Sequence, residues 1–565
     1  MSLPFDLKDH GTVYQEVDPG HCPPLPPEEA KSMDFLDLCY RTLCAVMFNH
    51  ASSGHPGGSI SSGRFVASLL YRNLDYDISD PMDRTADLVS YAAGHKALGL
   101  YAMWALRNEV VRQSYPAELP DDVLQQLRLE DLLGFRKNPI TRTPLYRQFG
   151  AKPLDGHPTP ETPFIWLSTG PSGVGVASTT GLALTLKDMY REDAPRVHII
   201  EGEGGMTPCR VSEALAAAAS SGLDNLYMHV DWNQASIDSD HVTRDGSQPG
   251  EYVQWDPREF LLVHGFNVVL VPDGFDFAQV LEGQRQALAI DNGKPTAVVY
   301  RTVKGWQYGI EGSKSHGAGH KFYSEAYLES LRPFEERFGL QFPRFEGDKT
   351  PEAIEQAYYD SLLTIRQAFE ENPDLTQRLG GWIIGCKRRH EAQPRQLREG
   401  APNLERLYSE RLISPLERPD VCRYEAGSSQ TLRGALADCL NHVNQLTGGA
   451  EGRHAHHVTH LGLTAGVVQR RGGLGAGIER EGLTSELLAA ALAESLTFGD
   501  RGVEPQYDLP DLDLIALGDE QFDDWFGELG DQFHAIRGQF TDHATRVVAR
   551  VASAQQGGRG DGQHH

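Results

Sequence analysis

A glutamate and an asparagine follow two apolar segments of this sequence, at positions where they could hold a metal ion. Val197–Ile200 is predicted to form a strand that runs into Gly202-Glu203-Gly204, and a second predicted strand, Leu226–Val230, leads to Asn233. Open α/β sheets bind ligands at the carboxyl ends of their strands, and the two glycines let a backbone approach a ligand closely. Carboxylate and carboxamide oxygens suit Mg²⁺, which usually takes one or two carboxylates together with substrate phosphates. The pattern therefore predicts a magnesium site.

Four histidines lie in glycine-rich turns rather than on apolar faces, namely His55, His95, His157 and His316. A lone histidine is more often structural or solvated, but glycine neighbours allow a loop to approach a ligand. A neutral imidazole with a pKa of about 6.5 can give or take a proton near neutral pH. We therefore predict that these histidines take part in chemistry.

The segment 168–175, Ser-Thr-Gly-Pro-Ser-Gly-Val-Gly, follows an apolar run and opens a predicted helix. Backbone N–H groups at such a helix start can hold a diphosphate. An ordinary loop is the alternative interpretation of the same residues.

Strands and helices alternate from about residue 160 to 305, which predicts a doubly wound parallel sheet. The predicted strands are Phe164–Ser168, Val197–Ile200, Leu226–Val230, Phe266–Val271 and Thr296–Tyr300. The predicted helices are Ala30–Phe48, Val174–Tyr190, Val211–Ser220 and Phe277–Ile290. The domain prediction comprises an extended arm (1–28), a main α/β domain (29–320), a helical connecting region (321–415), a smaller degenerate α/β domain (416–555) and a disordered tail (556–565).

Six short motifs occur in the order that they have in transketolases, and the chain resembles that family over about residues 40–320. They are Ser-Gly-His-Pro-Gly-Gly (53–58), Gly-His (94–95), Gly-His-Pro (156–158), Gly-Pro-x-Gly (170–173), Gly-x-Gly followed by Asn (202–233) and Ser-His-Gly-Ala (315–318). One departure is Glu203, where the family has aspartate. A weaker likeness to the homodimeric first component of 2-oxo-acid dehydrogenase complexes is disfavoured by the motifs around His55 and His316.

The resemblance implies that the main domain binds the diphosphate of thiamine diphosphate through Mg²⁺. By that resemblance Glu203, the side-chain oxygen of Asn233 and the backbone carbonyl of Ala235 would ligate the metal. The cofactor loops would comprise Gly170, Ser172, Gly173, Gly202 and Gly204, with His95 nearby. His55, His157 and His316 would face the thiazolium ring and move protons on a ketose, while the cofactor supplies the carbanion.

The second half fits this family less well, because the pyrimidine-binding domain should carry a glutamate that activates the cofactor. The best match is 477–482, Gly-Ile-Glu-Arg-Glu-Gly, where the strict register places Arg480 at that position. Glu479 or Glu481 could serve after a one-residue shift, the site could be lost, or the segment could be a charged helix start. A histidine-rich stretch at 453–460 could bind zinc, but we interpret it as a polar loop.

We therefore expect a transketolase-like enzyme that transfers a two-carbon ketol unit between sugars, which could be phosphorylated. Family precedent implies a homodimer, or a heteromer in which a companion subunit completes the site. The alternatives are a 2-oxo-acid decarboxylating enzyme and a catalytically silent paralogue with a structural or regulatory role. Glu203 and Arg480 support the silent paralogue, and the four histidines argue against it.

The composition of the chain limits the classes of binding partner and the cellular compartment that we expect. The chain has 565 residues, and 52 Lys+Arg against 78 Asp+Glu give a net charge of −26, which argues against nucleic acid or an anionic membrane as partner. Seven cysteines without a Cys-x-x-Cys pair are typical of reduced thiols. No signal-peptide pattern or apolar run of about 18 residues occurs, so we expect a cytoplasmic protein.

Overall fold

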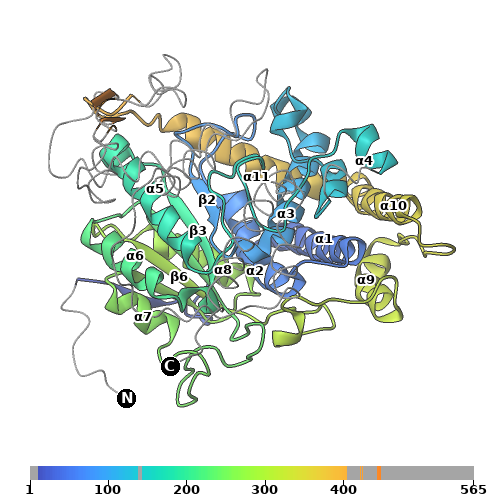
Figure 1. Ribbon diagram of the computed structural model, residues 1–565, viewed down its shortest axis with the longest axis horizontal. Helices are drawn as coiled ribbons and strands as arrows, with labels where there is room; N and C mark the ends of the chain where they lie inside the picture. Colours follow the sequence, from blue (N-terminus) through green and yellow to red (C-terminus); the bar gives the residue numbers. More distant parts are fainter. Residues whose placement is uncertain are drawn as a thin grey trace, which may run out of the picture. The chain divides into compact units, whose positions relative to one another are not determined.

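The computed structural model describes residues 11–137 and 143–403, with a few isolated residues between 420 and 446. Its described part is built on one sheet (Figure 1), with strands β1 (Tyr14–Glu16), β2 (Leu88–Tyr91), β3 (Val197–Gly202), β4 (Leu226–Trp232), β5 (Asn267–Val271) and β6 (Thr296–Arg301). The strand order is β1-β5-β6-β4-β3-β2, and all neighbours pair in parallel. The predicted α/β class with a parallel sheet is confirmed.

Helices cover both faces of this sheet, which explains why its central strands are almost continuously apolar. One face packs against α5 (Val174–Tyr190), α6 (Cys209–Ser220) and α7 (Pro257–Val263). The other packs against α1 (Pro27–Ala51), α2 (Pro56–Ser68), α3 (Ala97–Ser114) and α8 (Phe277–Leu288). Figure 1 shows the two groups of helices with the sheet between them.

Three long helices that follow the sheet in the sequence pack against α1, and the last two of them also pack against α3. They are α9 (Glu325–Phe338), α10 (Pro351–Glu370) and α11 (Pro373–Ala392), and the short α4 (Pro144–Phe149) lies in the same region. Phe35 of α1 contacts Phe338 and Phe369 edge-on, with ring centroids 5.4 and 4.9 Å apart. These helices thus share one apolar core with α1, α2, α3 and α8.

The prediction of a strand at Phe164–Ser168 is wrong. Phe164 has a left-handed backbone (φ +68°), which interrupts an extended segment, and the following apolar residues are buried as a loop. The edge position beside β3 is taken by β2, a short strand that the sequence analysis missed. Its four residues lie between polar segments, so they carry little local signal.

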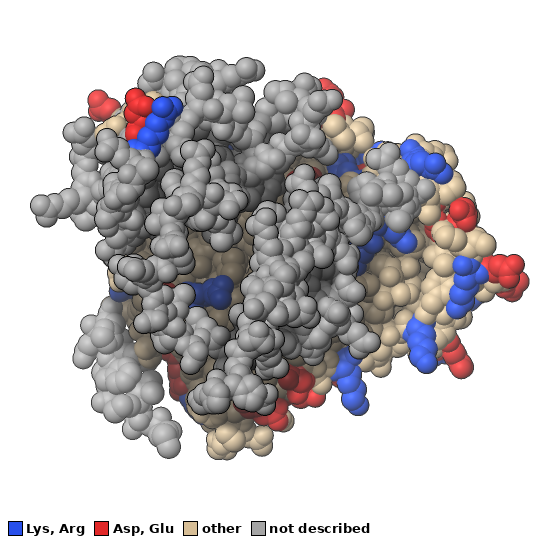
Figure 2. All heavy atoms as spheres, in the orientation of Figure 1, with Lys and Arg blue, Asp and Glu red and all other residues tan. Residues whose placement is uncertain are grey.

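None of the helices in the described part of the chain combines the length and apolarity that a membrane span requires. On the face shown in Figure 2, the basic and acidic side chains of the described residues are interspersed.

Asp87 ties the amino ends of β2 and β3 to the segment after α11. Its buried carboxylate accepts bonds from the Arg196 Nε (2.9 Å) and the Arg395 Nη2 (2.7 Å). Burial opposes ionisation, but Arg196 and Arg395 outweigh it and hold the pKa of Asp87 well below its ordinary value. The carboxylate is therefore ionised in the folded protein at neutral pH.

Replacing Asp87 with asparagine should lower the free energy of unfolding by about 3–5 kcal/mol at pH 7, because two arginines lose a buried partner. The folded pKa of Asp87 is depressed, so this stabilisation exists above the unfolded pKa of about 3.9 and is lost as pH falls below it. Urea unfolding between pH 3 and 7 should show the two proteins converging in acid. The exposed Asp121 offers a control: Asp121→Asn should change stability by less than about 0.5 kcal/mol. Parallel curves for wild type and Asp87→Asn would contradict the assignment.

Candidate functional site

The candidate site lies at the carboxyl end of the sheet, where the order of strand addition reverses. β2, β3, β4 and β5 are added in one direction, and β6 then returns to lie between β5 and β4. Ligands of doubly wound sheets bind at such a switch point. Glu203 follows β3, Asn233 follows β4 and Lys304 follows β6, so the topology delivers all three to this place.

Glu203 is 1 % exposed and begins a short 3-10 helix, Glu203–Met206. Its Oε2 accepts a hydrogen bond from the Asn233 backbone N–H (3.3 Å), while its Oε1 is buried without a hydrogen-bond partner among the described residues. Burial and the nearby Asp231 raise the pKa of Glu203 above its ordinary value. A buried carboxylate oxygen without a donor is costly, and a cation would satisfy it.

The other two predicted metal ligands, Asn233 and Ala235, already make hydrogen bonds within the chain. Asn233 donates from Nδ2 to Asp231 Oδ2 (2.9 Å) and accepts at Oδ1 from the Ala235 N–H (3.0 Å). The Ala235 carbonyl accepts from the Lys304 Nζ (2.9 Å). Since a carbonyl oxygen has two lone pairs, both oxygens can still approach a metal.

Within the described residues, no group of three or more His, Cys, Asp or Glu side chains is arranged to hold a metal ion. A cation here would depend on one carboxylate, Glu203, on the two carbonyl-type oxygens and on oxygens brought by a ligand. That donor set fits Mg²⁺, which is commonly bound by one or two carboxylates and phosphate oxygens.

Asp231 accepts hydrogen bonds from several residues of the site, although the sequence analysis did not single it out. Its buried carboxylate accepts from Lys96 Nζ (2.7 Å), Ser61 Oγ (2.6 Å) and Thr302, besides Asn233. Burial opposes its ionisation, but Lys96 and these donors lower the pKa of Asp231. A carboxylate can only accept, so it turns the amino group of Asn233 toward itself and the Asn233 oxygen away. The signal in the sequence that could have identified Asp231 is a carboxylate at the end of an otherwise apolar strand.

Three of the predicted histidines come together from three separate loops. The ring centroids of His55 and His95 lie 5.3 Å apart, those of His55 and His316 5.2 Å, and those of His95 and His316 5.3 Å. His55 directly precedes α2, and His316 follows a short helix, Gly312–Ser315. A Cβ at Gly57 would lie 2.1 Å from the Ser315 Oγ, so only glycine lets these two loops approach so closely.

The environment keeps these imidazoles neutral. Burial and the cations Arg136 and Lys304 lower the pKa of His55 to about 4, and burial and Lys304 lower the pKa of His316 to about 3. Burial and Lys96 hold the pKa of His95 well below its ordinary value. Lys304 Nζ lies 2.7 Å from the His316 Nδ1. An ammonium can only donate, so that nitrogen accepts and the proton of His316 resides on Nε2.

The predicted diphosphate loop lies next to the histidines. A Cβ at Gly94 would lie 2.7 Å from the Gly170 backbone nitrogen, and a Cβ at Gly170 would lie 3.3 Å from the His157 Cδ2. Gly173 is left-handed (φ +79°) and caps the start of α5, while Ser172 is exposed. The loop 170–173 is therefore in contact with the turn that carries His95 and with the ring of His157.

The second group of predicted site residues cannot be placed. Glu479, Arg480, Glu481 and the histidine-rich stretch 453–460 lie outside the described residues. Five residues of the site were missed: Ser61, Lys96, Asp231, Thr302 and Lys304. Lys96 follows His95 directly and Lys304 follows a predicted strand, so their positions in the sequence could have identified both as candidate site residues.

Comparison with known proteins addresses the same part of the chain. Residues 122–346 match the family described as "Transketolase, thiamine diphosphate binding domain". A mouse protein named "Transketolase-like protein 2" is 29% identical over 265 residues, covering 47% of this chain and 35% of the relative. Transketolase of Dictyostelium discoideum is 26% identical over 341 residues, covering 58% of this chain and 46% of that protein. Over the matched segment the comparisons support an assignment to the transketolase family.

The match leaves much of a transketolase without a counterpart, since the chain spans 35% to 46% of the length of these relatives. A solved structure of transketolase from Leishmania mexicana is similar with a TM-score of 0.48 and 22% identity, covering 77% of this chain and 57% of that one. The matched segment 122–346 contains Gly170, Glu203, Asn233 and His316. His55 and His95 precede it, and the fold brings them to the same place.

Proposed function

We propose that this chain binds thiamine diphosphate together with Mg²⁺ and transfers a two-carbon ketol unit between sugars. The observation that carries the proposal is the cluster of three neutral histidines beside the orphaned Glu203 oxygen at the switch point of the sheet. The thiamine-diphosphate-binding family match over the same segment supports the cofactor. A cytoplasmic location and work on free or phosphorylated sugars belong to the same proposal.

Each part of the site has a proposed task. Glu203, the Asn233 oxygen and the Ala235 carbonyl would hold the metal, and the N–H groups of Gly170, Ser172 and Gly173 before α5 would hold the diphosphate. When bound, thiamine diphosphate supplies a carbanion that attacks a carbonyl carbon. His55, His157 and His316 would exchange protons with the sugar hydroxyl and carbonyl oxygens, which neutral imidazoles can do near pH 7. His95 would lie against the diphosphate loop.

We further propose that the site works in a dimer, formed with a second copy or with a companion subunit. The family resemblance implies that the segment 477–482 activates the cofactor. In a dimer this segment could act on the cofactor bound to the other chain. Sedimentation of the protein with and without cofactor would determine its oligomeric state.

Saturating thiamine diphosphate with Mg²⁺ should raise the melting temperature, because a ligand that binds only the folded state stabilises it by about 2.7 kcal/mol at 100 times its Kd. Glu203→Ala and Asn233→Ala should abolish this shift. Glu213→Ala, on an exposed position of α6, is the matched control and should retain it. An unchanged melting temperature of the wild type would reject cofactor binding.

Turnover is tested separately with a ketose donor and an aldose acceptor, by following the donor shortened by two carbons. Binding without turnover would favour the silent paralogue, for which the Lys304 bond to the Ala235 carbonyl is a specific structural argument, because it uses one of the two lone pairs of a proposed metal ligand. Carbon dioxide release from a 2-oxo acid would favour the decarboxylating enzyme instead.

A further inference from the structure

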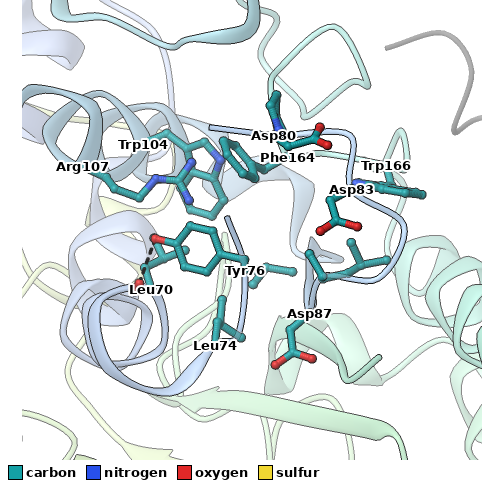
Figure 3. Close-up of a pocket in the computed structure, with 14 residues that line it drawn as sticks. Leu70, Leu74, Tyr76, Asp80, Asp83, Asp87, Trp104, Arg107, Phe164 and Trp166 are labelled. Carbon is teal, nitrogen blue, oxygen red and sulfur yellow. Dashed lines mark hydrogen bonds between the residues drawn. The ribbon is translucent and has the colours of Figure 1, made fainter. Parts of the chain in front are cut away.

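A cavity lies at the amino end of β2, whose carboxyl end leads to His95, and Figure 3 shows residues that line this cavity. Its volume is about 340 Å³ when the space open to solvent at its mouth is included. Four aromatic residues line it, Tyr76, Trp104, Phe164 and Trp166, together with apolar side chains such as Leu74 and Leu88. Arg107 of α3 is the only arginine or lysine among its lining residues.

The guanidinium of Arg107 is surrounded by aromatic rings. Its Cζ lies 4.1 Å from the ring centroid of Phe164, 5.0 Å from that of Trp104 and 5.2 Å from that of Tyr76. Arg107 is 3% exposed, and its Nε is buried without a hydrogen-bond partner among the described residues. Its polar neighbour is the Tyr76 hydroxyl. Cation–π contacts stabilise the charge in part, but they leave the Nε donor without an acceptor.

The carboxylates that line the cavity are held by other groups. Asp83 pairs with the His390 Nε2 (2.5 Å), and Asp87 pairs with Arg196 and Arg395. Asp80 accepts a hydrogen bond from the Met82 backbone N–H (3.0 Å). Among the described residues, Arg107 is therefore a buried cation without an anionic partner, a state that is costly unless a ligand supplies one.

Backbone strain points to the same place. Phe164 is a bulky residue with a left-handed backbone, and its ring is the nearest of the three to the Arg107 guanidinium. Residues in this conformation persist only where the surroundings enforce it, and they concentrate at ligand sites. The strained turn at Phe164 thus holds an aromatic wall over the cation.

We propose that this cavity binds a small monocarboxylate with an apolar body. The planar fork of a guanidinium matches a carboxylate, and the apolar body would lie against Trp166, Leu74 and Leu88. A phosphate dianion is disfavoured, because three aspartates line the same cavity. The proposal is independent of the function proposed above, since none of these residues belongs to that site.

The test uses benzoate as the probe and its neutral analogue benzamide as the chemical control, with the full chain in a thermal-shift titration. Benzoate should raise the melting temperature of the wild type in a saturable manner, and benzamide should not. Arg107→Met, which keeps a long apolar side chain, should remove the shift. Arg112→Met is the matched control: Arg112 lies on the same helix but pairs with Glu109, so this variant should respond like the wild type.

Two further measurements keep the proposal falsifiable if Arg107→Met does not fold. Arg107→Lys retains the charge but loses the fork, so benzoate should bind at least about tenfold more weakly. Fluorine spectra of 4-fluorobenzoate with the wild type should show line broadening that unlabelled benzoate reverses. The proposal is overturned if neither benzoate nor acetate binds the wild type, if binding survives in Arg107→Met, or if inorganic phosphate at equal ionic strength binds as well as benzoate.

Discussion

Replacing Lys96 with methionine should lower the free energy of unfolding by about 3–5 kcal/mol, because it leaves the carboxylate of Asp231 buried without its cation. Lys96 and Asp231 are both almost fully buried, and the two charged atoms lie 2.7 Å apart. Lys304 is close, but it donates to Ala235 and His316 instead. Urea or thermal unfolding of the metal-free protein would measure the loss.

Two control variants distinguish this ion pair from a general effect of removing lysine. Lys187 pairs with Asp224 at the partly exposed end of α5, so Lys187→Met should cost no more than about 1 kcal/mol. The double variant Lys96→Met with Asp231→Asn should recover much of the loss, because no unpaired charge remains buried. A loss below about 1 kcal/mol in Lys96→Met, or a double variant less stable than the single one, would contradict this account.

Single alanine variants of His55 and His316 should lose about 10²- to 10⁴-fold in ketol transfer, because each removes a positioned proton donor or acceptor. The shift of melting temperature caused by thiamine diphosphate and Mg²⁺ should persist, since neither side chain is a proposed metal ligand. The rate is measured with a ketose donor, and cofactor binding is measured on the same preparations. Wild-type activity in such a preparation is a precondition.

The exposed His241 serves as the control for general effects of removing an imidazole, and His241→Ala should retain activity. The pH dependence adds a second check. Burial lowers the pKa of His55 to about 4 and that of His316 to about 3, so both remain neutral down to about pH 5. Loss of activity with an apparent pKa of about 6.5 that disappears in either alanine variant would show that these histidines are not buried as the structure has them.

Local patterns were sufficient for most of the sheet. Val197–Ile200, Leu226–Val230 and Thr296–Tyr300 were predicted as strands and form the centre of the sheet. Such strands are buried on both faces, so their apolar character does not depend on distant residues. The edge strand β2 was missed and a strand was wrongly placed at 164–168, because a short edge strand and a buried apolar loop do not differ in local pattern.

The sequence by itself therefore determined the parallel sheet, the loops at its carboxyl end and the chemical types of Glu203, Asn233 and the histidines. Tertiary structure alone decided that Lys96 pairs with Asp231 across 135 positions and that Lys304 contacts both Ala235 and His316. It also left Arg107 beside three aromatic rings without an acidic partner among the described residues. The physical reason is that a charge has a definite partner only after folding removes it from water, and burial is a property of the packed chain rather than of any segment.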